Sequence, residues 1–421
     1  MKKFFALLLS LAMVLALVAC GQKDPTPDTP DTPDDPQTKV EYKVAMITDY
    51  GDITDQSFNQ TTYEACKAFA EDNSIEFSYF KPAGDNTADR VAMIEKAVDD
   101  GFNVIVMPGY AFGGAIVEAA PEFPDVKFIA LDVAAGDLLE TAVAKAGESY
   151  DFTPENWDLN KYVDMSNVYC AVYQEELCGY MAGYATVKLG YKNLGFLGGM
   201  AVPAVVRYGY GFVQGANAAA ADMGLTDVTI NYIYGGQFFG DADITAVMDT
   251  WYQGGTEVVF ACGGGIYTSA VDAAKKVDGK VVGVDVDQAG VIAKYAAGDG
   301  ADEATIAKYL DLTVTSAMKG LYPATYDTLN DVINNGNWEK YVGKIETLGL
   351  VSGTDPEANY VQIPMGDGTQ WSDSFTQDDY KAMVKDMFDG KITVSNNTSS
   401  DVSAADFATV ITVDDQGSIK G

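Results

Sequence analysis

Short apolar runs alternate with longer amphipathic segments along most of the chain. The run KVAMIT at 43–48 is typical of a buried strand, and the segment after it carries Tyr63, Cys66 and Phe69 at helical spacing. The pairing recurs: further strands are expected at 76–81, 103–107 and 126–131, and further helices at 87–100 and from Phe112 onward. Such alternation predicts a parallel sheet with helices on both faces.

A second series of the same kind begins near Asn193. Its strands are expected at 193–199, 228–234, 257–262 and 280–284, each followed by a helical stretch. The pattern therefore predicts an α/β fold with two doubly wound lobes. The acidic, aromatic and weakly periodic segment 134–167 is interpreted as an insertion on the first lobe. The tail at 391–421 contains short strand-like pieces (KITV and ATVITV). The sequence pattern assigns them no role.

The amino terminus has the layout of a secretory signal. Lys2 and Lys3 precede an apolar run that continues to Ala19 and is too short for a typical spanning helix. We therefore expect a signal peptide at 1–19. The tetrapeptide LVAC, which ends at Cys20, resembles a bacterial lipobox, in which the cysteine is lipidated; the alternative is a plain signal peptide with an incidental cysteine. The Pro- and Asp-rich stretch that follows, to residue 39, predicts a solvated, fairly stiff linker.

Charge and composition exclude several classes of function. The chain has 61 acidic and 27 basic residues and a net charge of −34. A field of this sign repels phosphate backbones, so we expect no binding to nucleic acid. The chain also has no histidine, which removes the commonest general base and the commonest metal ligand. We therefore expect neither a cofactor nor a metal, and an enzyme is disfavoured.

The cysteines beyond residue 40 do not form a metal site. Cys66, Cys170, Cys178 and Cys262 include no CxxC pair, and no histidine can complete a zinc site. We expect small buried thiols. A disulfide between Cys170 and Cys178 stays open as an alternative.

Polar and glycine residues follow the predicted strands. In parallel α/β sheets, ligands bind at the carboxyl ends of the strands. Six residues stand at such ends here: Asp49, Gly109, Asp132, Gly199, Gly263 and Asp285. Each aspartate alone is explained as well by helix capping or a turn. Their shared position favours a binding site.

The string DYGDITDQSFNQ at 49–60 resembles the signature of the basic membrane protein family, the nucleoside-binding lipoproteins that feed ABC importers. Later blocks of that family are matched in the same order by GFLGGM at 195–200, Tyr208 with GYGFVQG, ACGGG at 261–265, VVGVDVDQ at 281–288 and TVTSAMK at 313–319. The resemblance implies a type I periplasmic binding protein, whose two lobes close on a ligand about a hinge of three strands.

The resemblance also implies lobe boundaries. The first lobe is expected at 40–172 and the second at 173–312. The chain is then expected to return to the first lobe at 313–345. The remainder, 346–421, is expected to complete the second lobe and form the tail.

Site residues follow from the same resemblance, position by position. Phe58 and Tyr208 match two rings that stack on a purine, although Phe58 could instead be a core anchor. Asp285 matches a carboxylate that holds ribose hydroxyls, and Lys319 matches a family lysine but could be a solvated charge. Arg207 could pair with a ligand phosphate, a minor option. The expected ligand-binding residues are Asp49, Asp55, Ser57, Phe58, Asn59, Gly109, Asp132, Tyr208, Gly263, Gly264, Asp285 and Lys319. Of these, Gly263 and Gly264 would let the backbone approach the ligand.

The resemblance implies a protein that binds its ligand and releases it without changing it chemically. We expect a monomer, lipid-anchored on the extracytoplasmic face of the cell membrane, that binds a nucleoside, with a purine favoured, and delivers it to an ABC permease. The alternatives are a binding protein of the same fold for a sugar or a signalling compound, and a hydrolase that uses a carboxylate pair such as Asp49 and Asp55.

The lipobox generates the first testable prediction. Replacing Cys20 by alanine removes the only thiol that this motif offers for lipidation, so Cys20→Ala should leave the membrane fraction of cells and become soluble. Immunoblots of fractionated cells measure the distribution. Retention of the variant in the membrane fraction to the same extent as the parent would disprove the anchor.

Overall fold

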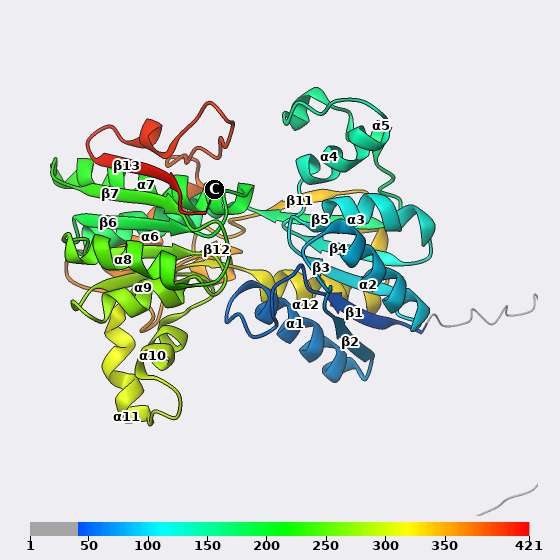
Figure 1. Cartoon of the computed structure of the whole chain (residues 1–421), viewed down its shortest axis with the longest axis horizontal. Coiled ribbons are helices and arrows are strands. Elements are labelled where there is room, and N and C mark those ends of the chain that lie inside the picture. The colour runs from blue at the N-terminus through cyan, green and yellow to red at the C-terminus, as the bar shows by residue number, and fades with distance from the viewer. Residues whose placement is uncertain (1–40, 421) are drawn as a thin grey trace, which may run out of the picture. The chain divides into compact units, whose positions relative to one another are not determined.

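The computed structural model describes residues 41–420, so the expected signal peptide, Cys20 and the linker at 20–39 lie outside the described residues. The first of its two sheets is entirely parallel, in the order β11-β5-β4-β3-β1-β2 (Figure 1). Its strands are β1 (Lys43–Ile47), β2 (Glu76–Phe80), β3 (Val104–Pro108), β4 (Lys127–Leu131), β5 (Val168–Tyr173) and β11 (Ile345–Leu348). The associated helices are α1 (Phe58–Asn73), α2 (Thr87–Asp99), α3 (Phe112–Ala119), α4 (Ala135–Lys145) and α12 (Leu321–Ile333).

The second sheet has the order β12-β10-β9-β8-β6-β7-β13, and β12 is antiparallel to β10. Its strands are β6 (Asn193–Gly198), β7 (Thr229–Tyr234), β8 (Val258–Cys262), β9 (Lys280–Asp285), β10 (Thr313–Lys319), β12 (Val361–Gln362) and β13 (Thr412–Ser418). The helices in this part of the chain are α6 (Glu175–Lys188), α7 (Pro203–Met223), α8 (Ala242–Gln253), α9 (Tyr267–Ala274), α10 (Ala289–Ala297), α11 (Glu303–Ile306) and α13 (Gln377–Phe388). The predicted pair of doubly wound α/β lobes is confirmed.

The apolar strand runs have a simple physical origin. Strands β3 and β8 are buried at every position, because helices cover both faces of a parallel sheet and leave no solvent-facing side. Within residues 41–420, no helix combines the length and the apolar composition that crossing a bilayer requires. The four cysteines of this region are free and buried, as expected, so Cys170 and Cys178 do not form a disulfide.

Three connections carry the chain between the two sheets. They follow β5 at Gln174, β10 at Gly320 and β11 at 349–360. The connections are hydrogen-bonded to one another: the Gln174 amide donates to the Leu348 carbonyl at 3.0 Å, and the Gly320 amide donates to the Tyr360 carbonyl at 2.6 Å. This arrangement matches the expected three-strand hinge.

Two expected boundaries need correction. Residues 313–319 were assigned to the return to the first lobe, but they form β10, which pairs with β9 in the second sheet. The return therefore begins after Lys319. It extends to Leu348, because β11 pairs with β5 along its whole length.

The segment 134–167 is only partly an insertion. Its first third is α4, the ordinary crossover helix between β4 and β5, which packs on α3. The excursion is confined to 146–167 and contains α5 (Leu159–Tyr162). Edge contacts of Trp157 with Tyr150 and Tyr162, at 5.7 and 5.5 Å between ring centroids, hold it together.

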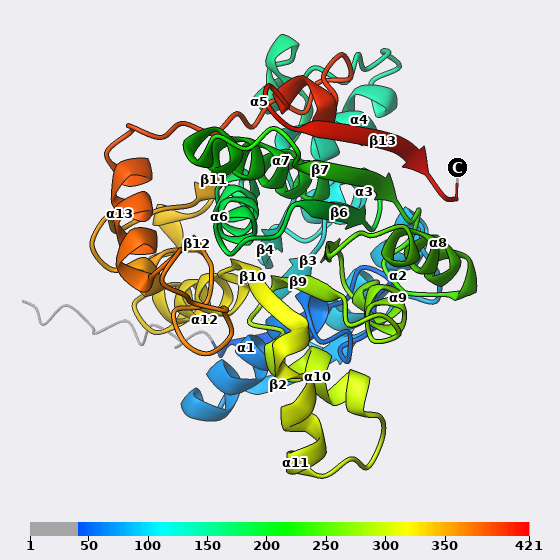
Figure 2. The same cartoon turned by 90° about the vertical axis from the view of Figure 1, so that its left-hand side faces the viewer.

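The tail completes the second sheet. Its last strand, β13, lies parallel to β7 at the sheet edge (Figure 2). It begins at Thr412, so only the end of the ATVITV piece enters a strand, and the KITV piece at 391–394 forms none.

Helices α6 and α7 pack backbone against backbone. A Cβ on Gly179 or Gly183 of α6 would collide with the carbonyl oxygen of Tyr208 or Phe212, respectively. Gly211 and Gly215 of α7 face α6 in the same way. Glycine allows this close approach because it has no side chain. The contact fixes the starts of both helices, which carry Glu175 and Tyr208 toward the space between the lobes.

We predict that Gly183→Ala lowers the free energy of unfolding by about 1–3 kcal/mol, because the added methyl group overpacks this interface. Gly290→Ala is the matched control: Gly290 lies in α10, and a Cβ there meets nothing within 4 Å. The Gly290→Ala control should leave the free energy of unfolding unchanged or raise it slightly. Urea denaturation of both variants measures the difference. Equal stability of the two would contradict the close packing of α6 and α7.

Candidate functional site

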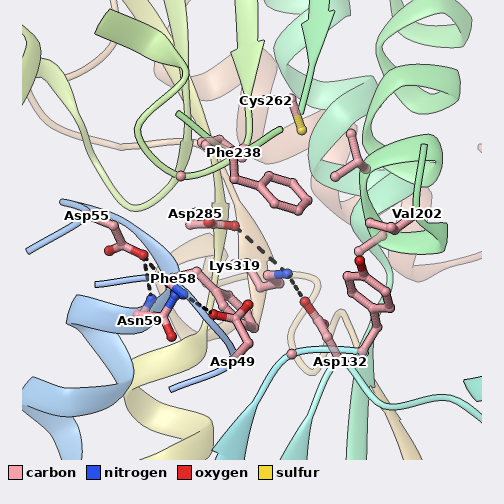
Figure 3. Close-up of a pocket in the computed structure, with 18 of the residues that line it drawn as sticks. Asp49, Asp55, Phe58, Asn59, Asp132, Val202, Phe238, Cys262, Asp285 and Lys319 are labelled. Atoms are coloured by element: carbon pink, nitrogen blue, oxygen red, sulfur yellow. Dashed lines mark hydrogen bonds and ion pairs between the residues drawn. The ribbon is translucent and has the colours of Figure 1, made fainter. Parts of the chain in front are cut away.

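A cavity of about 420 Å³ lies where the carboxyl ends of strands from both sheets meet (Figure 3). The first sheet contributes Asp49, Gly109 and Asp132, and the second contributes Gly263, Asp285 and Lys319. This is the position at which open α/β sheets bind ligands. All the expected ligand-binding residues except Ser57 line the cavity.

Asp49 is fixed at the end of β1 by its own loop. Its Oδ1 accepts hydrogen bonds from the Tyr50 and Gly51 amides at 2.6 and 2.7 Å. Burial nevertheless raises the pKa of Asp49, and the amide donors only partly offset this effect. Gly109 has a φ of +125°, and a Cβ there would lie 3.1 Å from the Asp49 side chain. A glycine at 109 therefore makes room for Asp49.

Asp55 acts as the cap of α1. Its two carboxylate oxygens accept from the backbone amides of Ser57, Asn59 and Gln60 at 2.9–3.1 Å. These amides are donors that a helix start leaves without intrahelical partners. Asp55 lines the cavity, but helix capping accounts for its hydrogen bonds.

Lys319 occupies the centre of a buried charged cluster. Its Nζ lies 2.5 Å from Asp132, 3.4 Å from Glu175 and 3.9 Å from Asp285. The side chain is 3% exposed, so the solvated-charge alternative is wrong. Burial alone would lower the pKa of Lys319, but these carboxylates raise it above its usual value, so the ammonium stays protonated.

Glu175 and Arg207 extend this cluster, and of the two only Arg207 lines the cavity. Arg207 Nε donates to Glu175 Oε2 at 2.6 Å, and the Glu175 side chain is fully buried. Burial by itself would raise the pKa of Glu175, but Arg207 and Lys319 together lower it. Glu175 was not among the expected site residues, because the sequence pattern did not predict β5, the strand that precedes it. The charge of Glu175 offsets the charge that Arg207 could offer to a ligand phosphate.

Asp285 adopts a left-handed backbone conformation at the end of β9, with a φ of +64°. Its Oδ1 accepts from the Tyr208 hydroxyl at 3.1 Å, and its Oδ2 accepts from the Ser57 hydroxyl at 2.5 Å. The structure thus identifies the partner of the Tyr208 hydroxyl. Tyr208 is only 2% exposed, and its ring packs edge-on against Phe260. Most of the ring surface is therefore unavailable to a ligand.

Phe238 is an aromatic lining residue that sequence reasoning missed. It lies in the loop after β7 and reaches into the cavity, 6.4 Å from the Tyr50 ring. A Cβ on Gly199 would collide with this ring, and one on Gly263 would lie 2.7 Å from it. The glycines at these strand ends therefore make room for Phe238. No periodic or motif signal marked position 238.

Two buried oxygen atoms at the cavity lack partners within residues 41–420. They are Oδ1 of Asn59 and Oδ1 of Asp132. A buried acceptor without a donor costs free energy comparable to a lost hydrogen bond. Each of these oxygens can accept a hydrogen bond from a hydroxyl or amino donor.

Comparison with known proteins gives relatives along most of the chain. The nucleoside-binding protein BmpA of an ABC transporter from Lactococcus lactis is 25% identical over 92% of this chain and 96% of its own length. Basic membrane protein B of Borreliella burgdorferi is 26% identical over 76% of this chain and 83% of its own. An uncharacterized lipoprotein of Pyrococcus abyssi is 26% identical over 75% of this chain and 69% of its own.

Solved structures agree on the fold. A solute-binding protein of an ABC transporter system from Aeropyrum pernix superimposes with a TM-score of 0.61 and 17% identity, over 86% of this chain and 95% of the other. A solute-binding protein of an ABC transporter system from Conexibacter woesei superimposes with a TM-score of 0.57 and 20% identity, over 84% of this chain and 99% of the other. At these identities, the likeness shows the fold alone, that of the type I periplasmic binding proteins.

A family model, described as ABC transporter substrate-binding protein PnrA-like, matches residues 42–354. The match covers well over half of the chain and every residue that lines the cavity. The chain therefore belongs to this family of ABC transporter substrate-binding proteins and is not an enzyme.

Proposed function

We propose that the chain binds a nucleoside, with a purine favoured, in the cavity between its lobes and delivers it to an ABC permease. We further propose that it is a monomer, held at the extracytoplasmic face of the membrane by a lipid on Cys20. The observation that carries the ligand proposal is the lining of the cavity: aromatic rings stand beside carboxylate and amide oxygens that can accept hydrogen bonds. The BmpA relative, aligned over nearly its whole length, is named for nucleoside binding.

The base would lie against Phe58 and Phe238. Both rings line the cavity and are only partly buried, one on each side of the cleft. Tyr208 is buried and tied through its hydroxyl to Asp285. We therefore place the second stacking ring at Phe238, in place of the expected Tyr208. Aromatic faces suit a purine because the stacking area is large and needs no particular hydrogen-bond pattern.

The polar groups would hold the rest of the ligand. Oδ1 of Asn59 and Oδ1 of Asp132 are unpartnered acceptors of residues that line the cavity from the first lobe. Asp285, on the second lobe, can accept from ribose hydroxyls, since a carboxylate has several acceptor positions. These acceptors favour a ligand that carries several donors.

Charge favours a neutral nucleoside over a nucleotide. The basic residues that line the cavity are Lys81, Arg207 and Lys319, and each is already paired with a carboxylate. Lys81 pairs with Asp52 at 2.9 Å at the cavity wall. A phosphate group would therefore meet mainly acidic side chains, and like charges across an interface cost binding free energy.

Aromatic stacking generates the next prediction. Loss of a stacking ring costs about 1–3 kcal/mol per base in other proteins, so Phe58→Ala and Phe238→Ala should each weaken purine nucleoside binding roughly 5- to 150-fold. Calorimetric titration gives the dissociation constants. The matched control is Phe152→Ala, which removes a 73% exposed ring outside the cavity and should bind as the parent does.

The variants must also melt cooperatively near the parent temperature without ligand, because Phe58 could otherwise act only as a core anchor. Parent-like affinity in both Phe58→Ala and Phe238→Ala would reject the aromatic clamp.

A further inference from the structure

Two hydrogen bonds beside the cavity join the lobes, and of the residues that make them only Asp285 lines the cavity. They connect the loop before α1, in the first lobe, with the end of β9 and the start of α10, in the second. The residues involved are Gln56 and Ser57 on one side and Asp285 and Gln288 on the other. Ser57 and Gln288 are fully buried, and neither lines the cavity.

Ser57 stands at the N-cap position of α1, yet its hydroxyl makes no capping hydrogen bond. Serine at this position ordinarily accepts from a backbone amide of the first turn. Here the neighbouring Asp55 takes that role by accepting from the amides of Asn59 and Gln60. The Ser57 hydroxyl is thereby free to donate across the cleft to Asp285 Oδ2, at 2.5 Å.

Gln288 makes the second cross-lobe contact. Its Nε2 donates to the Gln56 carbonyl at 3.2 Å. The same side chain is held from within the second lobe, since its Oε1 accepts from the Val284 amide at 2.9 Å. The backbone amide of Gln288 donates to the Ser316 hydroxyl at 3.1 Å. These bonds orient the side-chain amide of Gln288 so that its Nε2 points toward the first lobe.

The backbone on both sides is set for these contacts. Gln56 has a φ of +58°, and Asp285 has a φ of +64°. Left-handed conformations are costly for residues other than glycine and persist where surrounding contacts hold them. Gln56 on the first lobe and Asp285 on the second each provide the acceptor of a cross-lobe hydrogen bond.

We propose that Ser57 and Gln288 form a closure clasp, a pair of positioning residues that hold the lobes shut independently of direct contact with the ligand. The clasp sets the fraction of molecules that are open before a ligand arrives. The clasp rests on the proposed role in ligand binding, because closure of the lobes would retain a ligand of any chemistry. It does not depend on that ligand being a nucleoside.

The native Cys262 provides a reporter for opening. Its side chain lines the cavity, is 1% exposed, and is a free thiol. Burial raises the pKa of Cys262, so the closed form resists a thiol reagent. When opening is fast compared with labelling, the labelling rate follows the open population. Cys66, fully buried in the core of the first lobe, reports loosening of the fold in the same sample.

The experiment compares N-ethylmaleimide labelling of Cys262 in the ligand-free full chain, measured by peptide mass spectrometry at constant pH. A hydrogen bond to a charged acceptor is expected to be worth roughly a tenfold or larger change in the equilibrium. Ser57→Ala should therefore raise the Cys262 labelling rate at least about tenfold, and Gln288→Met should raise it in the same direction. Cys66 labelling should stay at the parent rate in both variants.

The matched control is Thr186→Val, which removes a buried hydroxyl that bonds only within α6, to the Ala182 carbonyl. It should leave both rates unchanged. Parent-like labelling of Cys262 in Ser57→Ala would overturn the clasp. An equal rise at Cys66 and Cys262 would overturn it as well, because the substitution would then have loosened the fold. Neither result depends on the ligand, so failure of the clasp and failure of the nucleoside proposal are distinguishable.

Discussion

A single buried ammonium group organises the region between the two lobes. Lys319 ends β10 of the second sheet and contacts Asp132, which directly follows β4 of the first. Burying an unpaired charge is prohibitively costly, so the ammonium requires carboxylates from its surroundings. Glu175, at the first crossing between the lobes, supplies another. The cluster therefore depends on the two sheets holding these positions relative to each other.

This constraint shapes what the cavity can bind. The cations are used within the protein, by Asp132 for Lys319 and by Glu175 for Arg207. What remains available to a ligand is a set of acceptors and aromatic surfaces. A neutral molecule with a flat ring and several donors fits that description better than an anion does. The electrostatics and the stacking surfaces thus favour the same class of ligand.

The sequence predicted the positions of strand ends better than the roles of the residues there. Asp49, Asp132 and Asp285 were expected at the cavity because the carboxyl ends of parallel strands share one edge of a sheet, and the structure places them there. Their individual contacts were not predictable. Whether an aspartate caps a helix, as Asp55 does, or faces the cavity depends on which amides the loop turns toward it.

Other features depended on long-range packing that local patterns do not encode. Phe238 lies in a loop after β7, and its place in the cavity is set by glycines far away in sequence, at 199 and 263. The assignment of 313–319 to the wrong lobe has a similar cause: an apolar run predicts a strand, but its partner strand decides the sheet, and here that partner is β9. Local periodicity therefore predicts the helices and strands. The arrangement of residues at the site depends on which strands pair and on how distant segments pack.

We propose that the cavity selects a neutral nucleoside. Calorimetric titration of the parent protein with a purine nucleoside, its free base, its 5′-monophosphate and a set of monosaccharides is the decisive experiment. The nucleoside should bind tightest. The base should bind more weakly because it lacks the ribose hydroxyls, and the monophosphate should bind much more weakly because acidic residues surround the site. Tighter binding of a monosaccharide or of the monophosphate than of any nucleoside would show that this selectivity is wrong.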